Sequence, residues 1–366
     1  MTGEDIARID GKKIYVAIPS FAKTGGGESL HHLVDVCNRN GMDAYVYYYD
    51  HPAKFVSCQK FSNLNLRFAE IVEDDDRNVL LVPEMCTFLL NRFKKVKTII
   101  WWLSLLFYLK SSRKYSELKY SNYEILLDAK SAAKRKNIRE FSFPYSIFRL
   151  MEYNMKFPSK QVPVRKMRYI DLHLYNCEYA HEFLAANGIN NTQYVCGPIN
   201  EVFFEDYVCK ERKDIILYNP SKSNVFTELV IKELKIRGIT KIIPLKGYNY
   251  SELLDLYSSS KIYMDFGDFP GPERIPREAV IRGCNIIVTD RGAAKNNIDI
   301  PIPDEFKFRF VPENVVPIVT KIELMLKDYE QDFHKFDAYR EKVKEQRKNF
   351  ESSVIDVMRR VLNDIE

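Results

Sequence analysis

Short runs of apolar residues alternate along the chain with longer stretches in which apolar positions recur every three to four residues. The first pattern predicts buried strands, the second predicts amphipathic helices, and their alternation is typical of parallel α/β architecture. The predicted strands cover residues 14–19, 44–49, 79–82, 98–103, 172–176 and 193–196, then 215–219, 241–245, 262–266 and 285–289. The predicted helices cover residues 26–39, 225–237, 250–259 and 276–282.

This alternation stops near residues 197–212 and then begins again. A chain of 366 residues also exceeds one typical domain and suits two. We therefore expect two Rossmann-like domains that face a central cleft, residues 1–198 and residues 199–366. A charged helical tail from about residue 315 is expected to cross back over the first domain. Residues 105–168 do not follow the pattern, and we expect a helical or irregular insertion there on the first domain.

Composition narrows the class of protein. Apolar residues make up 46% of the chain and charged residues 29%, which is the balance of a globular protein. The longest apolar run, residues 99–109, is too short for a membrane span, which needs about 20 residues. The seven cysteines have no metal-ligand spacing, so we expect free thiols in a reducing cytoplasm and no metal site. The acidic triplet Asp74-Asp75-Asp76 precedes a strand, which favours a solvated loop.

Basic residues concentrate in the expected insertion. Residues 110–168 hold 15 Lys and Arg against 5 Asp and Glu. Such a surface attracts negative charge. Because residues 105–109 are apolar and precede it, one interpretation is docking on an anionic membrane surface; the others are a cleft for an anionic glycan and a plain solvated face. We do not expect a nucleic-acid partner.

The first predicted strand is followed by the sequence GGGE at residues 25–28, which opens a helix. Glycines let the backbone approach a ligand closely, and a helix N-terminus offers N–H groups to phosphate. Gly26 and Gly27 are therefore candidates for phosphate contact, although a flexible connection has the same composition. His31 and His32 follow one turn later. Either is a candidate general base, and a structural histidine is the alternative.

In the second half, candidate ligand-binding residues follow three predicted strands. Asn219 and Lys222 come after the first of these strands, at the carboxyl edge where α/β folds bind ligands. A lysine there can meet a diphosphate. Gly247 and Tyr248 follow the second strand, where an aromatic ring can stack on a nucleobase. The third strand leads into a loop rich in Gly and Pro.

That loop, residues 266–279, has the sequence FGDFPGPERIPREA and feeds a helix. It carries Glu273, Arg274, Arg277 and Glu278 within six positions. A carboxylate at a helix start can have no role other than capping the helix or interacting with its dipole. Two arginines and two glutamates beside three prolines exceed what capping requires, so we expect ligand chemistry there.

The stretch REAVIRGCNII at residues 277–287 resembles the L-E-A-M-A-x-G-x-P-V-I signature of GT-B glycosyltransferases, in particular the retaining group that uses nucleotide-diphosphate sugars. The sequence DRGA at residues 290–293 resembles the S-D-x-G-G that follows it. Residues 26–28 are similar to the glycine loop of the first domain, and residues 175–180 to the segment before the linker. In that group two glutamates are spaced E-x(7)-E; here Pro270 stands eight residues before Glu278.

The resemblance implies roles for individual residues. Glu278 would accept hydrogen bonds from the nucleotide ribose, Lys222 would bind the diphosphate, and Tyr248 would lie near the base. The backbone of Gly26 and Gly27 would face the leaving phosphate. Asn219, Gly247 and Arg274 complete the expected donor-binding set. For catalysis we expect His31, Glu273 and Arg277, with cations in place of a metal to stabilise the leaving group.

The function expected from the sequence is therefore transfer of a sugar from a nucleotide-activated donor to a surface glycan or lipid-linked acceptor. We expect it to need no cofactor and to take place at the inner face of the cell membrane, in a cytoplasmic and peripheral protein of polysaccharide biosynthesis. Two alternatives remain. One is a nucleotide-sugar epimerase, and the other is a nucleotide-sugar-binding GT-B protein without transfer activity, which the missing first glutamate favours.

Overall fold

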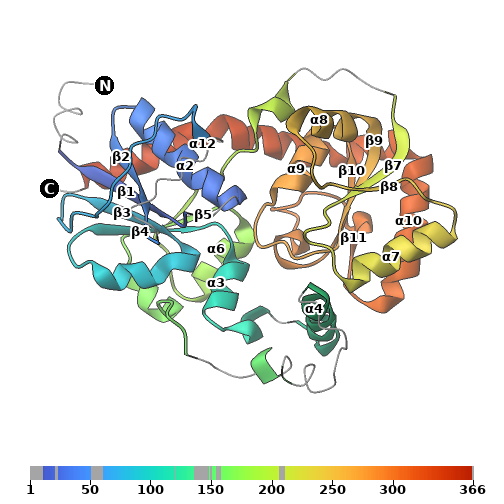
Figure 1. Ribbon diagram of the computed structural model, residues 1–366, viewed down its shortest axis with the longest axis horizontal. Coiled ribbons are helices and arrows are strands. Elements are labelled where there is room, and N and C mark those ends of the chain that lie inside the picture. Colours follow the sequence, from blue (N-terminus) through green and yellow to red (C-terminus); the bar gives the residue numbers. More distant parts are fainter. Residues whose placement is uncertain are drawn as a thin grey trace. The chain divides into compact units, whose positions relative to one another are not determined.

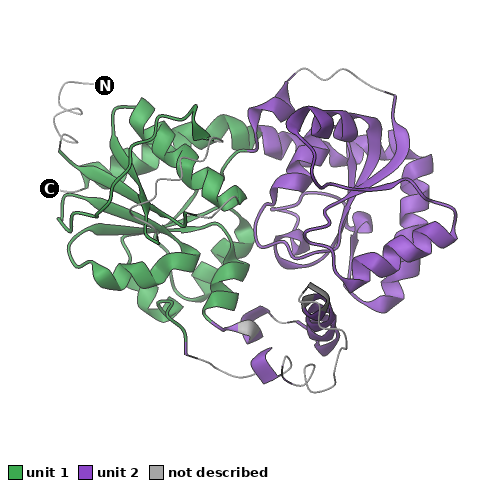
Figure 2. Ribbon diagram, in the orientation of Figure 1, with its two compact units in different colours: residues 1–112, 159–198, 345–366 green, residues 113–158, 199–344 purple. Residues whose placement is uncertain are grey.

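The computed structural model describes residues 11–20, 24–50, 61–118, 120–135, 148, 151–153, 158–205 and 211–364. The chain forms two compact units, coloured separately in Figure 2. Unit 1 comprises residues 1–112, 159–198 and 345–366, and unit 2 comprises residues 113–158 and 199–344. Each unit contains one parallel sheet with helices on its faces (Figure 1), which is the Rossmann-like architecture that the sequence predicts.

Unit 1 is built on a six-stranded parallel sheet in the order β2-β1-β3-β4-β5-β6. The strands are β1 (Lys13–Ile18), β2 (Asp43–Tyr48), β3 (Val79–Pro83), β4 (Lys97–Trp102), β5 (Leu172–Tyr175) and β6 (Thr192–Tyr194). In the register, Val16 lies opposite both Val46 and Leu81. Helices cover both faces, so the central strands are continuously apolar, and every residue of β3 is buried.

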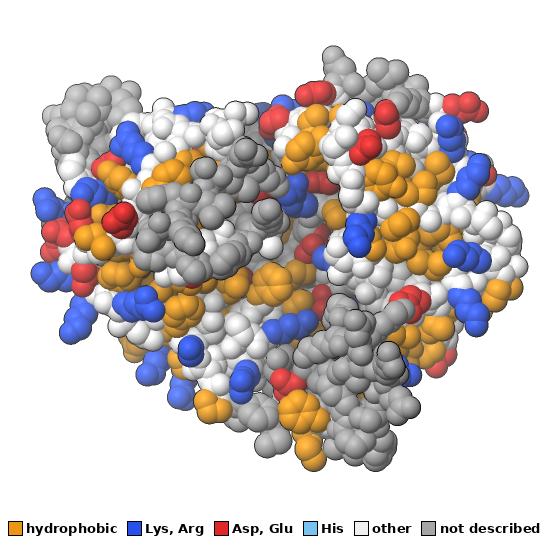
Figure 3. Space-filling model, in the orientation of Figure 1, with side chains coloured by type: hydrophobic (Ala, Val, Ile, Leu, Met, Phe, Trp, Pro, Cys, Tyr) orange, Lys and Arg blue, Asp and Glu red, His pale blue; other side chains and the backbone are white. Residues whose placement is uncertain are grey.

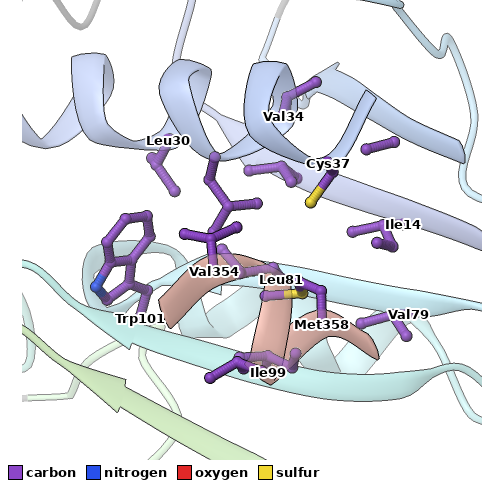
Figure 4. Packing of buried hydrophobic residues seen from close by; sticks show 14 of the residues in the cluster. Ile14, Leu30, Val34, Cys37, Val79, Leu81, Ile99, Trp101, Val354 and Met358 are labelled. Atoms are coloured by element: carbon purple, nitrogen blue, oxygen red, sulfur yellow. The ribbon is translucent and has the colours of Figure 1, made fainter. Parts of the chain in front are cut away.

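The helices of unit 1 come from distant parts of the chain. They are α2 (Gly25–Arg39), α3 (Leu105–Ser111), α6 (Glu178–Ala186) and the short helices η2 (Glu84–Arg92) and η4 (Val164–Tyr169). The long helix α12 (Asp337–Asn363) begins in unit 2 and belongs to unit 1 from residue 345. Figure 4 shows Val354 and Met358 of α12 packed among Leu30 of α2 and Leu81 of β3. The last helix of the chain is thus part of the core of the first sheet.

Unit 2 is built on a five-stranded parallel sheet in the order β11-β10-β9-β7-β8. The strands are β7 (Lys213–Tyr218), β8 (Ile242–Pro244), β9 (Ser260–Asp265), β10 (Asn285–Thr289) and β11 (Lys307–Phe308). The helices are α4 (Asn122–Arg135), α7 (Val225–Ile236), α8 (Tyr250–Ser259), α9 (Arg274–Ile281), α10 (Val315–Lys327) and α11 (Tyr329–Phe333). Shorter helical turns are η3 (Tyr115–Leu118), η5 (Glu201–Phe204), η6 (Gly292–Lys295), η7 (Asp304–Phe306), η8 (Pro312–Asn314) and η9 (His334–Phe336). Asn224 and Asn249 begin α7 and α8 with reciprocal capping boxes, which satisfy the free N–H groups of the first turn.

Residues 113–135 lie elsewhere than the sequence suggests. We expected residues 105–168 to form an insertion on the first domain, whereas α4 packs against α7 in unit 2. The hydroxyl of Ser131 in α4 accepts a hydrogen bond of 3.2 Å from the backbone N–H of Val225, the first residue of α7. Of the predicted insertion, residues 136–147, 149–150 and 154–157 lie outside the described residues.

The apolar stretch before this segment is also different from the expected membrane-docking surface. Residues 105–111 form α3, which buries Leu105, Leu106, Tyr108 and Leu109 in unit 1 and leaves only Phe107, 48% exposed, at the surface of the stretch 105–109. Burial in the core is the better use of these side chains, because the hydrophobic effect drives them out of water. In the described part of the chain, no helix combines the length and apolar character that crossing a bilayer requires.

The acidic triplet has a structural role. The Asp74 carboxylate accepts hydrogen bonds of about 3 Å from the backbone N–H groups of Lys94, Lys95 and Val96. Asp75 accepts hydrogen bonds from the side chain of Arg77. The bonds from the backbone of Lys95, Lys94 and Val96 hold the pKa of the Asp74 carboxyl below its usual range, because they stabilise its charged form. Asp74 therefore holds the segment that precedes β4, and Asp75 holds the turn that precedes β3.

Met358→Ala should test the contribution of α12 to unit 1. Met358 is 1% exposed, and removing a buried side chain of this size typically costs roughly 2–5 kcal/mol of unfolding free energy. Chemical denaturation measures the change. The control is Asp356→Ala, an exposed position of the same helix, for which we expect a change below about 0.5 kcal/mol. Equal effects of the two substitutions would contradict the packing of α12 in this core.

Candidate functional site

The point where the strand order reverses lies between β7 and β9 in unit 2. β8, the next strand in the sequence, pairs with one edge of β7, and β9 pairs with the opposite edge of β7. In open parallel sheets such a switch point leaves a crevice outside the carboxyl ends of the two strands, where ligands bind. Those ends lead here into residues 219–222 and residues 266–273. The first loop carries Asn219 and Lys222 of the predicted donor-binding set, and the second ends at Glu273, which was predicted as catalytic.

Asn219 shapes the first loop. Its side-chain oxygen accepts a hydrogen bond of 3.0 Å from the N–H of Ser221, and its carbonyl accepts one of 3.1 Å from the Ser223 hydroxyl. This turn places Lys222 two residues before Asn224, the N-cap of α7. The Asn219 side chain, predicted to contact the donor, is thus used to form the turn.

Lys222 reaches from the first loop to the second. Its ammonium group donates a hydrogen bond of 3.0 Å to the carbonyl of Asp268, forms an ion pair with Glu273, and lies 5.3 Å from the centre of the Phe269 ring. Burial opposes the charged form of this lysine, but the carboxylates of Glu273 and Asp265 outweigh it and raise the pKa of Lys222. Lys222 is therefore a cation held at the switch point at neutral pH.

Glu273 joins the loop to α9 with an unusual backbone. Its φ is +44° and its ψ is 140°, in a region that residues other than glycine rarely adopt. Such a conformation costs roughly 1–3 kcal/mol and persists only where the surroundings impose it. Here the Lys222 ion pair holds the side chain, and Arg277 holds the backbone by donating from Nε to the Glu273 carbonyl at 2.9 Å.

The sequence suggested that Glu278 lies at the start of its helix. In the structure it lies one turn inside α9. Its Oε1 accepts a hydrogen bond of 3.1 Å from Arg274, and its Oε2 accepts one of 3.2 Å from the Tyr257 hydroxyl of α8. The residue is only 4% exposed. Glu278 therefore ties α9 to α8 and does not cap its helix.

The segment after β10 supports the second loop from the other side. Gly292 has a φ of +59°, and a Cβ on this residue would lie 2.1 Å from the Phe269 carbonyl oxygen. The N–H of Ala293 donates to the same oxygen at 2.8 Å. Glycine is required at this position because any side chain would push the loop away from Ala293.

Arg291 fixes the same loop, a role that the sequence analysis did not predict. Its guanidinium lies between the rings of Tyr120 and Phe310, at 4.3 and 4.4 Å from their centres. It forms ion pairs with Asp268 at 2.9 Å and Asp128 at 3.3 Å. Since Tyr120 and Asp128 belong to the segment around α4, this buried cation explains why α4 packs on unit 2.

Gly247 and Tyr248 follow β8, the edge strand of the sheet. Gly247 has a φ of +82°, which glycine adopts without strain, and it leads to Tyr248, whose side chain is exposed. Tyr248 precedes Asn249, the N-cap of α8. The ring is accessible to a ligand, although no described contact orients it.

In unit 1 the glycine sequence forms the first turn of α2 rather than a loop. Thr24 caps this helix by accepting from the N–H of Gly27 at 3.2 Å, and Gly26 packs beside Leu103. Nδ1 of His31 lies 2.7 Å from the Gly27 carbonyl, which can only accept, so this nitrogen carries the proton. Nε2 then accepts from the Tyr48 hydroxyl at 2.8 Å.

These contacts correct the predicted role of His31 as a general base. The residue is buried, its ring stacks on Phe61, and both nitrogens are bonded within unit 1. Burial also lowers the pKa of His31, because it disfavours the charged ring. The histidine is a structural residue that joins α2 to β2.

The switch point of unit 1 contains a buried carboxyl group that sequence analysis missed. The chain moves from β1 to β2 and then to β3 on the other side, so the reversal lies between β1 and β3. Glu84 follows β3, is 1% exposed, and accepts from the N–H of Leu103 at 2.9 Å. Burial raises the pKa of Glu84 to about 7. Nothing in the local sequence VPEMC distinguishes it from a surface glutamate.

Comparison with solved structures identifies the architecture. A glycosyltransferase from Rickettsia africae ESF-5 matches 97% of this chain and 99% of its own, with a TM-score of 0.59 and 12% identity. TarM matches 97% of this chain and 99% of its own, with a TM-score of 0.62 and 9% identity. The chain has the GT-B fold. Anabaena HepE, solved in complex with UDP, is a further structure that matches this GT-B protein. The match covers 96% of this chain and 100% of the HepE chain, with a TM-score of 0.56 and 9% identity.

No family model matches the sequence of this GT-B protein, and no curated protein matches it significantly. At 9–12% identity the structural matches establish the fold, which confirms the predicted fold class. They do not transfer the role of any single residue. The roles of Lys222, Glu273 and Glu278 therefore depend on their own contacts.

Glu84 should make the stability of this GT-B protein depend on pH. Its folded pKa of about 7 lies above the ordinary value of 4.5, so the folded chain binds the proton more tightly than the unfolded chain. Its contribution to stability is therefore complete below pH 4.5 and is lost as pH rises through 7, in total about 3 kcal/mol.

Urea denaturation of wild type and Glu84→Gln at several pH values between 4.5 and 8 measures this contribution. The unfolding free energy of wild type should fall relative to that of Glu84→Gln across the range. Glu70→Gln, at an exposed position, is the control and should follow wild type. Parallel curves for wild type and Glu84→Gln would show that this carboxyl does not titrate differently on folding.

Proposed function

We propose that this GT-B protein is a glycosyltransferase that moves a sugar from a nucleotide-activated donor to a surface glycan or lipid-linked acceptor, without a metal. The observation that carries the proposal is the partly buried ammonium group of Lys222 at the switch point of unit 2, with Arg274 and Arg277 on the adjoining helix. Transfer of a sugar releases a nucleoside diphosphate, whose negative charge needs fixed cations nearby. HepE, which has the same fold, was solved with UDP and with UDP-glucose.

The residues of unit 2 suit distinct parts of such a donor. Lys222 binds the diphosphate, assisted by Arg274. Glu278 binds the ribose: a carboxylate has about four acceptor positions, and Arg274 and Tyr257 use two of them. Gly247 and Tyr248 lie beside the base. In this proposal Arg277, and Glu273 beside Lys222, act on the reacting sugar phosphate.

A GT-B protein that binds nucleotide-sugars without transferring them is the second candidate. Pro270 favours it, because the resembling family has a glutamate at that position, and the strained Glu273 is three residues away in sequence. Incubation with a panel of UDP-, GDP-, ADP-, CDP- and dTDP-sugars separates the two. A glycosyltransferase slowly hydrolyses its donor in the absence of acceptor, whereas a binding protein is stabilised against heat by the donor and leaves it intact. An epimerase converts the donor into an isomer.

Lys222→Ala should weaken binding of the preferred nucleoside diphosphate by about tenfold or more, because a hydrogen bond to a charged group contributes roughly 1.5–3 kcal/mol. Affinity for the corresponding nucleoside, which has no phosphate, should stay unchanged. Isothermal titration calorimetry measures both. Lys261→Ala is the matched control: Lys261 also forms an ion pair in unit 2, with Asp214, but it lies near the start of β9. Equal losses for the two variants would remove Lys222 from the proposed site.

The acceptor side of the proposal includes docking on an anionic membrane surface through the basic segment 110–168. The positive net charge of this segment supports docking. The apolar residues of α3, which were expected to contact the membrane, are mostly buried in unit 1. Lys and Arg side chains are dispersed over the face of the molecule seen in Figure 3 and do not form one band there. The membrane interaction that we propose is therefore electrostatic.

Binding to vesicles should accordingly require anionic lipid and should weaken as salt rises from 0.05 to 0.5 M, roughly, because exposed charges are screened within about 8 Å at physiological ionic strength. Sedimentation with vesicles of phosphatidylcholine alone and with added phosphatidylglycerol measures this dependence. Binding to the neutral vesicles, or no binding to either kind, would contradict the membrane partner and leave the glycan acceptor.

A further inference from the structure

Three carboxylates influence Lys222, and two of them are committed to other partners. Asp265 accepts from the N–H of Gly267 at 3.0 Å and from the Tyr263 hydroxyl at 2.8 Å. Asp268 accepts from Arg291 at 2.9 Å and from the Tyr120 hydroxyl at 2.7 Å. Within the described residues, Lys222 is the bonded partner of the Glu273 carboxylate, and the charge of Arg277 also acts on it. Glu273 is thus the carboxylate best able to leave Lys222.

The backbone of Glu273 also favours movement. Its φ of +44° is strained for a residue with a Cβ, and the ion pair with Lys222 helps to hold it there. Loss of the ion pair would remove one of the two contacts that impose this conformation and would leave the bond from Arg277 to the Glu273 carbonyl. Gly267 lies close to Lys222: a Cβ added to Gly267 would be only 3.0 Å from the Cβ of Lys222. The lysine is therefore closely confined.

We propose that Glu273 is a built-in substitute for the donor diphosphate, which neutralises Lys222 in the empty protein and gives way to a phosphate when a nucleoside diphosphate binds. The inference rests on the proposed function, since it takes a nucleoside diphosphate as the ligand of this site. A carboxylate and a phosphate both accept charge-assisted hydrogen bonds from an ammonium group. A phosphate can therefore replace the Glu273 carboxylate as the acceptor at Lys222, and the ammonium group stays charged and hydrogen-bonded.

The physical reason for such a substitute is the cost of an unpaired buried charge. The side chain of Lys222 is only 24% exposed, and removing one partner of a buried ion pair is strongly destabilising. Glu273 avoids that state whenever the ligand is absent. The consequence is competition, because a diphosphate must displace Glu273 before it binds Lys222. A nucleoside has no phosphate and does not compete.

Glu273→Gln should therefore bind a nucleoside diphosphate more tightly than wild type. The probe is UDP, or the diphosphate that the nucleotide panel selects, and calorimetry measures its affinity. We expect a gain of about tenfold, equivalent to about 1.4 kcal/mol. Affinity for the matching nucleoside should stay the same. Asp214→Asn, which removes the partner of Lys261 in the same unit, is the charge control and should leave UDP affinity unchanged.

Two further variants separate the causes. Glu273→Gly removes the carboxylate and suits a φ of +44°, so it keeps the test available if Glu273→Gln does not fold, and it should also tighten binding. In a Lys222→Met background, Glu273→Gln should no longer change UDP affinity. The ammonium group for which the Glu273 carboxylate and the diphosphate compete is then absent.

The outcomes distinguish the inference from the proposed function. If wild type binds a nucleoside diphosphate and Glu273→Gln binds it equally or more weakly, the substitute role is overturned; weaker binding would make Glu273 a ligand contact. If the gain persists in the Lys222→Met background, the competition is not for Lys222 and the inference again fails. If no protein in the series binds any nucleoside diphosphate, the proposed function fails together with the inference.

Discussion

The structure around the second switch point depends on one requirement, which is that the cation of Lys222 be neutralised in a partly buried position. β7 and β9 end side by side, so their loops must share the space at this edge of the sheet. Lys222 links them by bonding to both the backbone and a side chain of the loop after β9. A positive φ at Glu273 persists because the ion pair holds its side chain and Arg277 holds its carbonyl. A charge held in this way is ready to meet an anionic ligand.

The loop between β9 and α9 is held by a second buried cation. Arg291 binds the Asp268 side chain, while Lys222 binds the Asp268 carbonyl. Gly292 allows Phe269 to bond to Ala293 on the same side. Two cations and one glycine thus fix a segment that has no regular structure of its own. Arg291 also brings Tyr120 and α4 to unit 2, so a segment inserted in the first half of the chain helps to position a loop of the second half.

The two units use their chain ends differently. Unit 1 obtains part of its core from α12, the last helix of the chain, whose Val354 and Met358 pack beside strands from the first hundred residues. Unit 2 is closed by α10 and α11, which precede that helix. Burial of apolar side chains explains why α12 continues into unit 1: its C-terminal half is amphipathic, and its apolar face needs a core to cover it.

The sequence by itself determined the two parallel sheets, because the alternation of apolar runs and helical periodicity is a local property. The strand at 285–289 and the helix at 250–259 coincide with the predicted ranges, and the other predicted strands agree to within a few residues. The two-residue β11 was too short to predict. Lys222 was a candidate because a lysine follows the end of a predicted strand, and Glu273 and Glu278 were candidates because of the charged Gly/Pro-rich loop and the resemblance to the GT-B signature. Tertiary structure alone decided their partners. That Lys222 meets Glu273, that His31 is bonded on both sides, that Glu84 is buried, and that Arg291 recruits α4 all depend on which distant segments come together, and pairwise contacts between distant residues leave no periodic pattern in one sequence.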